Sequence, residues 1–110
     1  MIEGIVRKSH SKNYADGKIK IEIWFRDKFE KHFPDKNNCR NPIKVIIEKD
    51  IYTMFFRKTP FNKYLWLSPT VYDENNTRIR MTDVVERHGF SKDDRVAFKK
   101  TGKVTYVIVK

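Results

Sequence analysis

Two polar stretches of the chain are rich in cations and poor in acids. Residues 7–20 contain five lysine and arginine side chains against one carboxylate, and residues 56–64 contain three against none. Such cations bind phosphate oxygens, and arginine, asparagine and carboxylate groups also bind the edges of bases. The residue types therefore predict contacts to nucleic acid from two separate basic segments.

The candidate residues differ in the kind of contact that their side chains suit. Lysine is a compact charge without a planar fork, which assigns four residues to phosphates: Lys8, Lys12, Lys58 and Lys63. Directional donors and acceptors are assigned to base edges: His10, Asn13, Tyr14, Asp16, Arg57, Thr59 and Asn62. The first segment also supplies Arg7, Ser9, Lys18 and Lys20. Outside both segments, Arg78 and Arg80 precede an expected helix and are candidate phosphate contacts.

Several of these residues have a second interpretation. Asp16 stands before Gly17, and because Asp-Gly pairs form tight turns, a plain turn is favoured for Asp16 over a base contact. A solvated loop position is an equal alternative for Asn13 and Asn62. Solvent exposure is an equal alternative for Arg78 and Arg80.

The positive charge is spread along the whole chain. The sequence has 24 Lys and Arg residues against 14 Asp and Glu residues, and residues 1–34, 35–70 and 71–110 carry net charges of +3, +4 and +3. A basic tail would concentrate this charge at one end. A folded domain with so much self-repulsion usually meets a polyanion, so we expect nucleic-acid binding rather than only a solvated surface.

Alternating apolar residues predict seven short strands. The clearest run is residues 18–25, in which Ile19, Ile21 and Ile23 alternate with Lys20, Glu22 and Trp24. Similar patterns cover residues 2–8, 43–48, 51–57, 64–67, 95–98 and 103–109. The strand at 64–67 is expected to end at Ser68-Pro69. Two short helices are expected at residues 27–33 and 81–88, ended by Pro34 and Gly89.

These elements predict one mainly β domain, a barrel or a sandwich. The spacing of most aromatic residues along strands and helices favours a place in the core over stacking on single strands: Trp24, Phe29, Phe33, Phe55, Trp66 and Phe98. Tyr14 and Phe61 are exceptions, because both lie inside the basic segments. Cys39 is the only cysteine, which excludes a disulfide framework and indicates a reducing compartment.

The order of the elements and the closing run, Gly89-Phe90-Ser91-Lys92-Asp93-Asp94-Arg95-Val96-Ala97-Phe98, resemble a known family. This is the DNA-binding pseudobarrel family of plant "B-three" transcription-factor domains and of effector domains of EcoRII-like restriction endonucleases. The run is similar to the family's helix-Gly-Leu/Phe-x-x-Gly-Asp-x-Val-x-Phe ending. Asp93 stands where the family usually has Gly, and Asp tolerates a left-handed turn. The ending also resembles the shorter swapped-hairpin barrels of bacterial transition-state regulators, which explain fewer of these residues.

The resemblance implies a seven-stranded open pseudobarrel with two short helices. It also implies two arms, residues 7–20 and 56–64, that enter the major groove of double-stranded DNA and read its sequence. The chain would be the effector, or recognition, domain of a type II restriction endonuclease in the prokaryotic cytoplasm. By itself it would be a non-catalytic monomer without a cofactor. Because the chain stops inside a strand pattern, we expect it to be a piece of a longer protein.

Other functions are weaker alternatives. Asp73-Glu74 and Asp93-Asp94 would supply the carboxylates of a small metal-dependent nuclease, although both pairs look like turns. A barrel that binds single-stranded DNA or RNA is a third interpretation. The apolar start, residues 2–6, is too short to span a membrane, so no membrane partner is expected.

Overall fold

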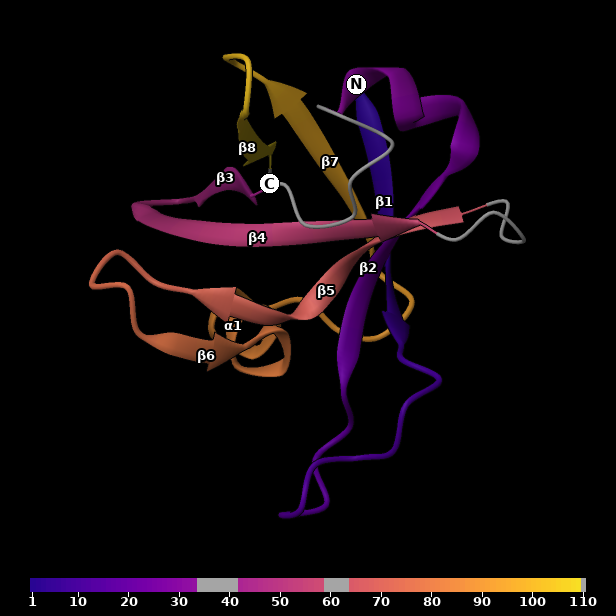
Figure 1. Cartoon of the computed structure of the whole chain (residues 1–110), viewed down its shortest axis with the longest axis vertical. Coiled ribbons are helices and arrows are strands. Elements are labelled where there is room, and N and C mark those ends of the chain that lie inside the picture. Colours follow the sequence, from indigo (N-terminus) through magenta and orange to yellow (C-terminus); the bar gives the residue numbers. More distant parts are fainter. Residues whose placement is uncertain (34–41, 59–63, 110) are drawn as a thin grey trace.

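The computed structural model describes residues 1–33, 42–58 and 64–109. In chain order, the elements are β1 (Ile2–Lys8), β2 (Ile21–Arg26), the 3-10 helix η1 (Asp27–His32), β3 (Pro42–Ile47), β4 (Asp50–Lys58), β5 (Tyr64–Tyr72), β6 (Arg78–Arg80), α1 (Met81–Arg87), β7 (Arg95–Lys100) and β8 (Thr105–Val109). Figure 1 shows their arrangement. None of the helices in these described ranges is long and apolar enough to cross a membrane.

Seven of the strands close into a barrel. The strand order is β2-β1-β7-β8-β3-β4-β5-β6, and a further pairing of β2 with β5 joins the sheet to itself. Neighbouring strands are antiparallel except β3 and β8, which run parallel, and β6 continues the sheet from β5 outside the ring. The predicted mainly β pseudobarrel is confirmed, with the correction that the barrel is closed rather than open.

Three elements differ from the sequence prediction: β5, the first helix, and β6, an eighth strand that the sequence did not predict. β5 continues through Ser68-Pro69 to Tyr72 and there pairs with β6. The register of β4 against β5 shifts between Met54 and Phe56, and such an irregularity accommodates a proline that cannot donate to a regular ladder. The first helix is a 3-10 helix rather than an α-helix, and Phe33 at its end is buried while Phe29 packs at the margin of the core.

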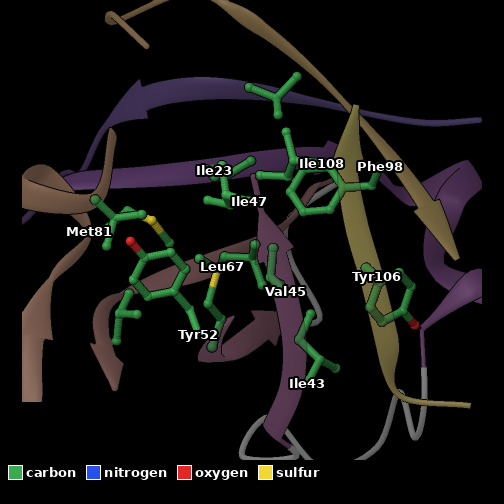
Figure 2. Close-up of a cluster of buried hydrophobic side chains, with 14 of the residues drawn as sticks. Ile23, Ile43, Val45, Ile47, Tyr52, Leu67, Met81, Phe98, Tyr106 and Ile108 are labelled. Atoms are coloured by element: carbon green, nitrogen blue, oxygen red, sulfur yellow. The ribbon is translucent and has the colours of Figure 1, made fainter. Parts of the chain in front are cut away.

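The core fills the barrel with inward-facing aliphatic and aromatic residues, as Figure 2 shows. Ile23 and Ile47 lie near Phe98 and Ile108 in this view, and all four are buried. Tyr106 is fully buried, and its hydroxyl donates to the His32 carbonyl at 2.7 Å, which ties η1 to the barrel. Burial raises the pKa of Tyr106 to about 12.

The segment after α1 closes the helix and returns the chain to the barrel. Gly89 has φ +77° and the Phe90 amide donates to the Val85 carbonyl, so the helix ends at the glycine as predicted. Asp93 has φ +73°, which confirms the left-handed turn expected there. The Asp93 amide donates to the Val6 carbonyl, and the Val6 amide donates to the Asp94 carbonyl. These bonds fix the turn against β1.

A polar cluster around the buried His88 attaches the end of α1 to the turn between β3 and β4. His88 is 4% exposed. Its Nδ1 lies 3.2 Å from Glu48 Oε1 and its Nε2 lies 2.8 Å from the Tyr52 hydroxyl. Asp50 completes the cluster, at 3.4 Å from His88 Nε2. Satisfied buried polar groups of this kind fix one relative position of the elements that carry them.

Gly4 allows the close approach of β1 to β2, which leads to a prediction. A Cβ atom at Gly4 would lie 2.8 Å from Ile23 Cγ2 and 2.9 Å from Phe25 Cε1. We therefore expect Gly4→Ala to lower the free energy of unfolding by about 1–3 kcal/mol, as overpacked cores do, measured by urea denaturation. Gly102→Ala is the matched control, since its Cβ would meet Thr105 at 3.4 Å and above. Equal stabilities for the two variants would contradict the crowding.

Candidate nucleic-acid interface

The first basic segment forms an arm that projects from the barrel between β1 and β2 (Figure 1). We call residues 7–20 the first arm. At its base, the Ser9 amide donates to the Lys20 carbonyl. At its tip, the Gly17 amide donates to the Tyr14 carbonyl, Gly17 has φ +86°, and Asp16 Oδ1 accepts from the Lys18 amide. The turn interpretation of Asp16 and Gly17 is therefore confirmed.

The tip of the first arm is held against the strand that precedes α1. Arg80 Nη1 donates to Asp16 Oδ2 at 2.7 Å, and the same guanidinium lies 3.9 Å from the centre of the Tyr14 ring. The Arg80 hydrogen bond and the Lys18 amide lower the pKa of Asp16. Burial raises the pKa of Tyr14. A phosphate contact of Arg80 stays a prediction, and the structure gives this residue a second role as the anchor of the arm.

The side of the first arm that faces α1 makes further contacts. The Thr82 hydroxyl donates to the Ile19 carbonyl at 2.6 Å. Lys18 Nζ lies 3.8 Å from Asp83 Oδ1 and 3.6 Å from Glu86 Oε2. Together with the Arg80 contacts, these bonds join an otherwise solvent-exposed loop to helix α1. The arm therefore has a defined position before any ligand binds.

The other candidates on the first arm divide by exposure. Lys8, His10, Lys12 and Asn13 are exposed. Lys20 is half-buried, with its ammonium 5.3 Å from the centre of the Tyr14 ring. Ser9 is buried, and its hydroxyl accepts from the Ser11 amide. Arg7 is exposed and forms an ion pair with Asp93 at 2.6 Å.

The remaining candidates lie on β4 and β6 or outside the described residues. Arg57 is exposed on β4 opposite Trp66 of β5, and Lys58 is opposite Leu65. Arg78 is exposed on β6. Thr59, Asn62 and Lys63, and with them Phe61, fall outside the ranges that the structure describes.

The register places the second basic segment at the other end of the same strands. Lys58 and Tyr64 are the described residues of that segment nearest its undescribed part, and Tyr64 is paired with Arg26 at the end of β2. The first arm joins β2 at its beginning, at Ile21. Five strand steps of about 3.3 Å separate these ends by roughly 17 Å. The outward-facing surface of β1, β2, β5 and β4 therefore lies between the two basic segments; we call it the outer face.

Aromatic and basic residues form a row across the outer face. Ile5 is opposite Trp24, Trp24 is opposite Trp66, and Trp66 is opposite Arg57. The residues on either side of Trp24, Ile23 and Phe25, are buried in the core. Because successive side chains of a strand alternate between faces, the row lies on the outside of the barrel.

Two hollows flank Trp24 and Tyr64 on this face. The larger, of about 560 Å³, has Arg7, Arg26 and Arg95 among its lining residues. The second, of about 380 Å³, lies at the base of the first arm, and its lining is Ser9, His10, Ser11, Glu22, Trp24, Tyr64 and Trp66. The ring centre of Trp24 lies 5.5 Å from that of His10 and 5.5 Å from that of Tyr64.

Glu22 is the carboxylate beneath the second hollow. It is 7% exposed, and its Oε1 accepts from Trp24 Nε1 at 3.0 Å. Ser9 also hydrogen-bonds this carboxylate. Burial raises the pKa of Glu22, because desolvation disfavours the charged form more than these hydrogen bonds favour it.

Two of the carboxylates considered for a nuclease, Asp73 and Asp94, accept hydrogen bonds from backbone amides in turns. Asp73 Oδ1 accepts from the Asn75 and Thr77 amides, and Asp94 Oδ2 accepts from the Ser91 amide at 2.7 Å. Within residues 1–33, 42–58 and 64–109, no three His, Cys, Asp or Glu side chains gather in a way that would hold a metal ion.

The sequence prediction missed the aromatic residues of the outer face. Phe33 and Phe98 are core residues as expected, but Trp24 and Trp66 are half-buried and line hollows, so their predicted place in the core is wrong. A signal for Trp24 was present, because it alternates with Ile21 and Ile23 and shares its face with Glu22. Tyr64 and Arg26, which are opposite each other on this face, were also missed by the sequence prediction.

Comparison with known proteins identifies no relative. No family model, curated protein or solved structure matches this chain.

The anchoring of the first arm leads to a prediction for Arg80. We expect Arg80→Ala to speed hydrogen exchange at the amides of Gly17 and Tyr14 several-fold, because the ion pair to Asp16 and the contact with the Tyr14 ring are both lost. The stability of the barrel should change little, as for other exposed ion pairs. Arg78→Ala is the matched control on the same strand. Equal exchange rates in the two variants would show that Arg80 does not hold the arm.

The environment of Glu22 predicts a pH dependence of stability. Its pKa in the folded state lies above its ordinary value of 4.5, so the folded state keeps the proton to higher pH than the unfolded state. The free energy of unfolding of the native chain therefore falls as pH rises from about 4.5 to the folded pKa. Glu22→Gln should lack this fall, and Glu86→Gln should keep it, in urea denaturation at a series of pH values. Parallel curves for Glu22→Gln and the native chain would refute the shift.

Proposed function

We propose that this chain is a sequence-specific double-stranded DNA-binding domain that contacts the major groove through its first arm and outer face. The observation that carries the proposal is the position of the first arm, which projects at one end of a face lined by Arg7, Arg26 and Arg57. Its anchoring to α1 reduces the entropy lost when the arm enters a groove.

The dimensions and charge of the outer face suit duplex DNA. Its length of roughly 17 Å, from strand geometry, exceeds the width of the major groove, about 12 Å. A duplex lying on the face would thus meet the first arm at one edge and the end of β4 at the other. The net charge of +10 supplies attraction to the phosphates.

The biological setting forms part of the same proposal. The element order and the closing run around Gly89 and Asp93 resemble the DNA-binding pseudobarrel family. On that basis the chain is the recognition domain of a type II restriction endonuclease in a prokaryotic cytoplasm, with catalysis assigned to another domain of the parent protein. Incubation with plasmid DNA and Mg²⁺ tests this, and specific cleavage by the 110-residue chain would contradict it.

Competition binding tests the choice of nucleic acid. Duplex DNA, single-stranded DNA and RNA of equal length compete for the protein at a fixed salt concentration, and we expect duplex DNA to win. Selection from a random duplex library then identifies a preferred site. Preference for a single strand would support an aromatic stacking surface of the kind used by open barrels and would overturn the proposal.

Variants of Lys12 and Arg57 distinguish contacts to phosphates from contacts to bases. We expect Lys12→Ala to weaken binding to all duplexes alike and to lower the slope of log K against log salt by about one. Arg57→Ala should cost about 1–3 kcal/mol on the selected site and relax discrimination at one base pair, because a guanidinium binds two acceptors of one guanine.

Lys103→Ala is the control for this pair of variants. Lys103 is exposed between β7 and β8, and Figure 1 places that connection at the end of the molecule opposite the first arm. It should bind every duplex as the native chain does. If Arg57→Ala weakens random DNA as much as the selected site, Arg57 is a phosphate contact, and if Lys103→Ala has the largest effect, the interface lies elsewhere on the barrel.

A further inference from the structure

The hollow at the base of the first arm has the composition of a site for a small planar ligand. Its volume of about 380 Å³ lies within the range of about 300–1,000 Å³ typical of small-molecule sites. Three large aromatic side chains, Trp24, Tyr64 and Trp66, line it together with His10. Tyr64 is 45% exposed, and large aromatic surfaces left in water commonly mark a binding site.

The rings are placed to stack rather than to fill the core. The ring centres of His10 and Tyr64 each lie 5.5 Å from that of Trp24, with the planes tilted by 50° and 41°. Trp66 is opposite Trp24 on the next strand. A nucleobase has a π face of its own and stacks on such side chains without regard to sequence.

Glu22 adds a specific polar group to this apolar site. It is 93% buried, its position is set by Trp24 Nε1 at 3.0 Å, and it lines the hollow. An ionised carboxylate only accepts hydrogen bonds, and its two oxygens have about four acceptor positions. It therefore favours a ligand edge with an amino group. Thymine has no amino group. Its one N–H lies between two carbonyl oxygens, and the carboxylate repels these oxygens.

We propose that this hollow receives one unstacked nucleobase that carries an exocyclic amino group, namely cytosine, adenine or guanine. Trp24, Tyr64 and Trp66 stack on the base, and Glu22 accepts from its amino group. The proposal extends the proposed function, because the base comes from a duplex bound across the outer face. The hollow adjoins the first arm through Ser9, His10 and Ser11, so a base displaced by the arm would be adjacent to it.

The charge of the molecule argues against the other ligand that aromatic residues and a carboxylate commonly bind, a methylated lysine. The net charge is +10, and Arg57 acts electrostatically on Glu22 from the same face. A basic peptide would be repelled where a nucleic acid is attracted.

The test uses duplexes that contain one base opposite an abasic site, because an unpaired base is the least costly to extrude. Tryptophan fluorescence and affinity are measured for cytosine, adenine, guanine and thymine at that position and for a fully paired duplex. We expect quenching and at least tenfold tighter binding for one or more of the three amino-bearing bases, relative to thymine and to the paired duplex.

Variants assign the effect to the hollow. Glu22→Gln should reduce the preference for the unpaired base, measured as the ratio of its affinity to that of the paired duplex, at least fivefold, and Glu74→Gln, on the connection between β5 and β6, should keep the native ratio. Trp66→Phe should retain part of the preference and Trp66→Ala should lose it. A melting curve accompanies each variant, and the conservative Trp66→Phe keeps the test valid where Trp66→Ala does not fold.

The outcomes separate this inference from the proposed function. Tight duplex binding that ignores the unpaired base, with no quenching, overturns the nucleobase site alone. Failure to bind any duplex overturns the proposed function, and quenching by dCMP, dAMP or dGMP but not dTMP then still supports the site. Quenching by a peptide with trimethylated lysine, and by none of the nucleotides, overturns it.

Discussion

The pairing of β2 with β5 is the constraint on which the rest of the structure depends. It closes the sheet, so neither strand has a free edge, and it sets which side chains face inward. Ile23 opposite Leu67 and Phe25 opposite Leu65 then fill the barrel. The alternate pair, Trp24 and Trp66, must face outward. The same hydrogen-bonded register thus builds the core and the aromatic surface, and a shift by one residue would exchange them.

Helix α1 and the strand residue before it hold the first arm in place. Thr82 and the strand residue Arg80 fix the first arm, while His88 joins the other end of the helix to the β3–β4 turn. The helix and the residue before it therefore connect the first arm to the β3–β4 turn by polar contacts at both ends. In the proposed DNA-binding function, an arm positioned in this way would present the exposed Lys12 and Asn13 to DNA from a fixed base.

Local patterns predicted most of the elements and little of the site. Alternation identified β2, and the left-handed turn at Asp93 followed from residue chemistry. Alternation separates two faces of a strand without saying which is inside, so Trp24 and Trp66 were assigned to the wrong one. Arg80 and Asp16 are 64 positions apart, and no local signal links them. A proline usually ends a regular strand. β5 continues through Pro69 because the register of β4 against β5 shifts beside it.

The parallel pairing of β3 with β8 has a consequence for synthesis of the chain on the ribosome. β8 is the last strand, and it lies between β7 and β3 in the ring. Until Thr105–Val109 has left the exit tunnel, β3 and β7 both lack a neighbour and the barrel stays open. Its apolar interior is then exposed to other chains, and such unpaired edges favour association. Slow translation while β8 is still inside the tunnel would prolong that vulnerable interval.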